Sequence, residues 1–148
     1  MPKSVSVDTA LVSVLAADAA LLALCPGGVY FGTAPQSRRN FVLVTLVASF
    51  DQAQFAAAPQ LRRAIEDTTY LVRAVMLDSA TGNADDAAQR IDELLEDQPL
   101  QIPGYGWLST VRTERIRYPE TDTVDQTIRW QHHGGHYRVQ VTPIGEAQ

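Results

Sequence analysis

Three histidines stand close together near the C-terminal end of the chain, at positions 132, 133 and 136, on either side of a glycine pair. Imidazole nitrogen is a common zinc ligand, but a zinc site needs about three converging ligands. Successive residues of a strand point to opposite faces of a sheet, so His132 and His133 are not expected to share one ion. No cysteine pair and no His-Glu-x-x-His spacing completes such a site. We therefore predict strand histidines and no metal site.

Three arginines, Arg112, Arg115 and Arg117, give one segment a basic character. Guanidinium groups bind carboxylates and phosphates through paired hydrogen bonds. In a regular strand, Arg115 and Arg117 share a face while Arg112 lies on the other face with Glu114. Nucleic-acid binding is the weaker interpretation, because the formal net charge is −5 and no exposed aromatic residues are interleaved with the arginines. We predict interface or rim charges.

The remaining reactive groups fit structural roles. The chain contains neither a Gly-x-Ser-x-Gly nucleophile elbow nor a glycine-rich phosphate loop. The carboxylates between residues 85 and 97 fall on the polar face of a predicted helix, where solvation explains them. Cys25 follows an apolar helix and has no base near it in sequence, so we predict a buried small apolar side chain. The sequence thus predicts neither an enzyme nor a bound cofactor.

Length and composition are those of one globular domain over residues 1–148, with 45% apolar and 20% charged residues. The apolar stretch from Leu11 to Leu24 is too short to cross a bilayer. Asp18 interrupts it and Asp8 stands just before it, which argues against a signal peptide. We expect a soluble, cytoplasmic product that does not enter a membrane.

Periodicity places the secondary structure. A helix over residues 8–24, capped by Asp8, is predicted to end at the Pro-Gly-Gly of residues 26–28, and a short extended piece follows. Further elements are predicted as a strand over 41–50, a loop over 51–66, a strand over 68–78, a helix from Asn83 to before Pro99, and strands over 108–118 and 127–141. The order predicts an α+β fold: an antiparallel sheet of about four long strands with two helices packed on one face.

Two features of these strands bear on assembly. The strand over 41–50 is apolar on both faces, so its own helices are expected to cover one face and a neighbouring subunit the other. In the last strand the apolar positions switch from even to odd across Gly134-Gly135. Either a β-bulge in one continuous strand or a two-residue hairpin turn would produce that switch.

Several segments together resemble a known family. They are the opening Asp8-Thr9-Ala10-Leu11, the Ala17-Asp18-Ala19-Ala20-Leu21 run, the Gly28-Val29-Tyr30 exit, the Ala34-Pro35-Gln36 turn, the strand from Phe41, and the His136-Tyr137-Arg138-Val139-Gln140-Val141 end. In these the chain is similar to the tail terminator, or tail completion, proteins of long-tailed bacteriophages, a family also found in gene transfer agents. The similarity covers about residues 7–142. It departs from the family pattern at residues 119–126 and at the His-Gly-Gly-His segment, which look longer than usual.

The resemblance implies a structural virion protein of the tail or neck. Such proteins form a ring of six copies on the last ring of the tail tube, stop its polymerisation and present a joining surface to the head completion or connector protein. DNA passes through the lumen without specific binding. The family carries no catalytic residues. The alternatives are another neck or head–tail connector protein of similar fold and, from a different class, a small ligand-binding α+β domain.

Position alone suggests which residues meet a partner. The projecting loop and the basic strand together supply six candidates for the subunit or tube interface: Phe50, Gln54, Phe55, Arg112, Arg115 and Arg117.

Overall fold

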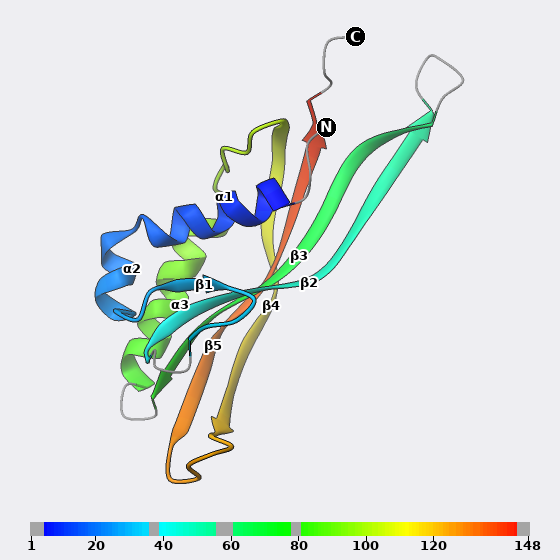
Figure 1. Ribbon diagram of the computed structural model, residues 1–148. Coiled ribbons are helices and arrows are strands. Elements are labelled where there is room, and N and C mark those ends of the chain that lie inside the picture. Colours follow the sequence, from blue (N-terminus) through cyan, green and yellow to red (C-terminus); the bar gives the residue numbers. More distant parts are fainter. Residues whose placement is uncertain (1–4, 36–38, 56–60, 78–80, 145–148) are drawn as a thin grey trace.

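The computed structural model describes residues 5–35, 39–55, 61–77 and 81–144. Its elements are α1 (Val5–Ala16), α2 (Ala19–Leu24), β1 (Val29–Phe31), β2 (Phe41–Phe55), β3 (Leu61–Leu77), α3 (Thr81–Leu95), β4 (Tyr105–Thr121) and β5 (Arg129–Pro143). The predicted α+β class is confirmed. The sheet has five strands in the order β1-β2-β3-β5-β4, and the three helices lie on one side of it (Figure 1).

The sheet is mixed rather than purely antiparallel. The short piece at Val29–Phe31 is a strand, and it pairs parallel with the start of β2, Tyr30 opposite Leu43. The pairs β2–β3, β3–β5 and β5–β4 are all antiparallel. The sequence pattern missed β1 as a sheet member because three residues are too few to show a period.

The first predicted helix is two helices. Asp18 adopts extended backbone angles, φ −88° and ψ 114°, and its carboxylate accepts a hydrogen bond from the N–H of Leu21 at 2.9 Å, so it caps α2. Arg90 of α3 holds the same carboxylate at 2.6 Å, which fixes the break. Asp8, the predicted cap, lies inside α1 and instead accepts a hydrogen bond from the hydroxyl of Tyr70.

The helices bury one face of the sheet, and the core lies between them. Alternate residues of each central strand point into it, as strand geometry requires. Its fully buried large side chains are Val7, Leu11, Leu15, Leu21, Val42, Val44, Tyr70, Val72, Met76, Ile91, Leu95 and Tyr137. Cys25 is also buried, as predicted, and burial raises the pKa of its thiol to about 12.

The long strands extend further than the helices that cover them. β3 has 17 residues, a length of about 55 Å, whereas the 15-residue α3 spans about 22 Å. The β2–β3 hairpin therefore projects past the helices at one end of the sheet, and the β4–β5 hairpin projects at the other (Figure 1). The loop predicted over 51–66 was wrong, since β2 continues to Phe55 and β3 starts at Leu61. A projecting arm has no core to face, so it lacks the apolar period by which a strand is recognised.

β5 is one continuous strand, which excludes the hairpin turn at Gly134-Gly135. It carries no bulge there either: its register with β3 runs unbroken through the glycines. The change in apolar parity arises because Trp130 packs on the sheet face away from the helices, 6.4 Å from the ring of Phe41, while Tyr137 faces the helices.

The two glycines are explained by close packing of backbones. A Cβ on Gly134 would lie 2.0 Å from the carbonyl oxygen of Val72 in β3. A Cβ on Gly135 would lie 2.7 Å from the carbonyl oxygen of Glu114 in β4. Any side chain at either position would push neighbouring strands apart.

No helix in the described part of the chain combines the length and the apolar character needed to cross a membrane.

Candidate functional site

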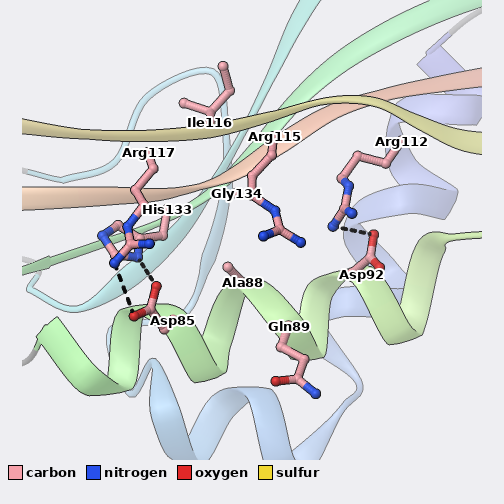
Figure 2. Close-up of a pocket in the computed structure, with 10 residues that line it drawn as sticks. All are labelled: Asp85, Ala88, Gln89, Asp92, Arg112, Arg115, Ile116, Arg117, His133 and Gly134. Carbon is pink, nitrogen blue, oxygen red and sulfur yellow. Dashed lines mark hydrogen bonds and ion pairs between the residues drawn. The ribbon is translucent and has the colours of Figure 1, made fainter.

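A groove with a volume of about 480 Å³ runs between α3 and β4. Its lining, drawn in Figure 2, consists of Asp85, Ala88, Gln89, Asp92, Arg112, Arg115, Ile116, Arg117, His133 and Gly134. All three arginines singled out in the sequence extend from β4 toward α3, while the side chain of Ile116 points away (Figure 2).

The shared face of the three arginines corrects the prediction that Arg112 lies opposite the other two. Between Arg112 and Glu114 the register of β4 on β5 shifts by one, so Thr113 is an extra, bulged residue. A bulge reverses the side-chain alternation beyond it. Arg112, opposite Tyr137, and Arg115, opposite Gly135, therefore both face the helices.

Two of the arginines are held by carboxylates of α3. Arg112 Nη1 lies 3.1 Å from Asp92 Oδ1, which also accepts the hydroxyl hydrogen of Tyr137 at 2.9 Å. Burial, with Asp92 alongside, raises the pKa of Tyr137, which keeps its hydroxyl a donor. Arg117 Nη2 lies 3.4 Å from Asp85 Oδ2. These pairs attach the edge strand to the helix layer.

Arg115 differs from its neighbours. It is exposed, and among the described residues no carboxylate forms an ion pair with it. It stands between two arginines that are already paired (Figure 2). A guanidinium placed this way can take a carboxylate or phosphate oxygen from outside the chain, which is binding chemistry and supplies no nucleophile or proton acceptor.

His133 belongs to this groove and His132 does not. Nδ1 of His133 lies 2.7 Å from Asp85 Oδ1 beneath α3. On the other face of the sheet, His132 Nδ1 accepts the Nε–H of Arg73 at 3.1 Å, which leaves Nε2 to donate to Glu120 at 2.8 Å. The predicted opposite orientation of the two histidines is confirmed. Both lie in strand β5, as predicted, and both are buried.

His132 is a structural part of the face away from the helices. Its ring stacks on Tyr118 with centroids 4.5 Å apart and an interplanar angle of 7°. Desolvation lowers its pKa, so the neutral ring with one donor and one acceptor is favoured. The described residues contain no group of three or more metal-ligating side chains.

The other three predicted interface residues lie elsewhere. Phe50 is 54% exposed in β2, on the sheet face away from the helices, so the structure does not bring it near Arg112, Arg115 or Arg117 of the same chain. Gln54 and Phe55 have backbones within β2, paired with Arg62 and Leu61, and their side chains lie outside the described residues.

Comparison with known proteins gives a fold and no family. No protein-family model matches the chain, and no curated protein matches it. Among solved structures, one chain from the virion of a native gene transfer agent particle superposes with a TM-score of 0.62 at 15% identity, over 90% of this chain and 92% of that one. The fold is shared with a virion component.

A second solved chain superposes with a TM-score of 0.58 at 12% identity over the whole of both chains. At such identities the likeness concerns the fold. Because nearly the full length matches in both cases, the long arms and the helix layer belong to one common architecture.

Proposed function

We propose that this chain is a structural virion protein of a tailed-phage-like particle, acting as a tail terminator. In this role about six copies form a ring on the end of the tail tube, stop its polymerisation and offer a surface to the head completion or connector protein. DNA passes through the lumen without specific binding. The observation that carries the proposal is the near full-length fold likeness to a chain of a gene transfer agent virion.

Exposed apolar side chains on β2, which forms part of the projecting β2–β3 hairpin (the β2 arm), support the proposal that the protein assembles with other chains. Leu46, Val47 and Phe50 of β2 are 40%, 52% and 54% exposed. Large apolar side chains gathered on a projecting arm add nothing to the core of their own chain, and burial against a partner would recover about 25 cal/mol for each Å² of apolar surface removed from water.

The charge distribution suits the same role. The formal net charge of −5 disfavours binding of a polyanion that must slide through a lumen. The arginines of β4 are largely engaged by α3, so they do not form an open basic track along which phosphates would bind.

The mass of the purified protein in solution, measured across concentration and joined to negative-stain images, tests the proposal. A closed ring of six 16.2-kDa chains has a mass of about 97 kDa. Addition of tail tubes should give tubes capped at one end. A protein that stays monomeric at every concentration and leaves tube ends bare is not a tail terminator.

The alternative function within the same structural class is that of another neck or head–tail connector protein of similar fold. It would form its ring without capping tubes, so the tube-end images separate the two roles.

A further inference from the structure

Two long stretches of sheet edge are paired with no strand from the described part of this chain. β1 covers the outer edge of β2 only from Val42 to Val44. On β4, the segment after α3 covers the outer edge near its middle, where Thr110 O accepts from Asp97 N at 2.8 Å and the N–H of Arg112 donates to Glu96 at 2.5 Å. Beyond these points, no described segment pairs with either edge.

Unpaired strand edges invite another strand, since each presents a row of backbone donors and acceptors. β2 and β5 run in one direction and β3 and β4 in the other. Consequently, if copies are related by rotation about an axis roughly along the strands, β4 of one copy runs antiparallel to β2 of the next. The alternation of directions then continues around a ring.

The outer edges of β2 and β4 also match in the direction of their backbone N–H and C=O groups and in the face of the sheet to which their side chains point. Helix-facing residues direct their backbone groups outward at both edges, as Val42 and Val44 do toward β1 and Thr110 and Arg112 do toward the segment after α3. Past the bulge at residue 47, the helix-facing residues of β2 are Ser49 and Asp51, opposite Thr68 and Glu66. Past the bulge at residue 113, those of β4 are Arg115 and Arg117.

We propose that residues 115–118 of β4 pair antiparallel with residues 48–51 of β2 in a second copy of this chain, forming the subunit interface of the ring. The inference rests on the proposed function and specifies its contact. In one register Asp51 lies opposite Arg115 and Ser49 opposite Arg117 on the helix side. Phe50 then lies opposite Ile116 and Ala48 opposite Tyr118 on the other side.

Charge and apolar character agree with this pairing. The exposed carboxylate of Asp51 meets the arginine that has no ion pair among the described residues, and cross-strand pairs of opposite charge are favourable. Phe50, 54% exposed, meets Ile116 and lies next to Tyr118, 38% exposed. By contrast, pairing β4 with β4 about a two-fold axis at Ile116 would set Arg115 against Arg117, which is unfavourable.

Two edges on opposite sides of one sheet make a head-to-tail contact, and such a contact closes into a ring or continues as a filament. The two free stretches lie toward opposite ends of the sheet, so neighbouring copies are staggered along the strands. Closed sheets require such a stagger together with a tilt of the strands to the axis.

Paired cysteines test the contact. Phe50 and Ile116 form a non-hydrogen-bonded pair in the proposed register, with Cβ atoms close enough for a disulfide after slight adjustment. Under mild oxidation, the double variant F50C/I116C should give a ladder of covalent multiples on a non-reducing denaturing gel, up to the ring size. F50C alone and I116C alone should give no ladder, and their mixture should stop at dimers. F50C/Y118C tests the register shifted by two residues.

Hydrogen exchange on the unmodified protein gives a second measurement that needs no variant. The amides of Asp51 and Arg115 should exchange at least about a hundredfold more slowly in the ring than in the dilute monomer, while those of β3, paired on both sides, stay slow in both. Rings that assemble without a ladder and without this protection overturn the proposed contact and leave the ring itself standing. Absence of any assembly, even on tail tubes, overturns both.

Discussion

Strand β2 passes through two different environments with similar side chains. Val42 and Val44 are fully buried beneath the helices, whereas Leu46, Val47 and Phe50 further along the same strand are 40–54% exposed. Both stretches carry large apolar residues in the sequence. The difference teaches that the central sheet is stabilised by its own helices, while the projecting part of β2 carries apolar side chains and a strand edge that the described residues leave exposed. Stability and assembly should therefore respond to different mutations.

The largest effect is expected where the strand backbones approach most closely. A Cβ at Gly134 would lie 2.0 Å from the carbonyl oxygen of Val72, so Gly134→Ala must shift β3 or β5. We expect a loss of about 3 kcal/mol or more in the free energy of unfolding, measured by chemical denaturation.

Gly32→Ala is its matched control. No atom lies within 4 Å of the added Cβ there, and only the backbone φ of +79° is unfavourable, so a loss of about 1 kcal/mol is expected. Equal losses for the two variants would contradict the packing argument.

Two alanine substitutions, one in the core beneath the helices and one on the projecting part of β2, compare the contributions of these regions to stability and assembly. Ile91 of α3 is fully buried, and Ile91→Ala should cost about 2–5 kcal/mol of folding stability. Phe50→Ala should change the stability of the monomer by about 0.5 kcal/mol or less but weaken assembly, measured by sedimentation across concentration. If Phe50→Ala instead unfolds the monomer and leaves assembly intact, the division between core and arm is wrong.

Low pH should reduce the free energy of unfolding, because Asp18 binds Arg90 only when its carboxyl group is ionised. Its pKa is lowered to about 2 by the hydrogen bond from Arg90, against 3.8 for the ordinary carboxyl. A depressed folded-state pKa adds stability above the unfolded value, so this contribution is complete above about pH 5 and is lost as the pH falls from about 4 to about 2. After allowance for solvent screening we expect about 1 kcal/mol. Asp18→Asn keeps a good helix cap and should flatten that part of the stability–pH curve.

The smallest effect is expected from reversing one charge at the proposed contact between β2 and β4. Asp51→Arg and Arg115→Asp each place like charges at the proposed contact, which is unfavourable by about 0.2–1 kcal/mol per pair. Each variant alone should need higher concentrations to assemble, and an equimolar mixture should recover, because alternating copies restore both pairs. A mixture no better than either variant would show that the two positions do not meet. The stability of each monomeric variant, measured in parallel, is the control for effects within the chain.

Particular residues show how much the sequence determined. The alternation of apolar residues around Tyr70 and Val72, the helix stripe containing Ile91, and the break at Pro26 were local signals, and they predicted the α+β class and most elements. The opposite orientation of His132 and His133 followed from strand geometry alone. The three arginines were found by type, but their common face was not predicted, because a one-residue bulge at Thr113 leaves no signal in composition or period.

Tertiary structure decided what depends on partners far apart in the chain. Asp67 lies on the sheet face away from the helices and is almost fully buried, and Arg138, 71 residues later in the chain, donates a hydrogen bond to it. That hydrogen bond lowers the pKa of Asp67. The division of the first helix depends likewise on Arg90 reaching Asp18. Which sheet edges stay uncovered depends on the strand order. Periodicity reports which face a residue prefers, while the neighbour that it meets is fixed only when the sheet and helices pack.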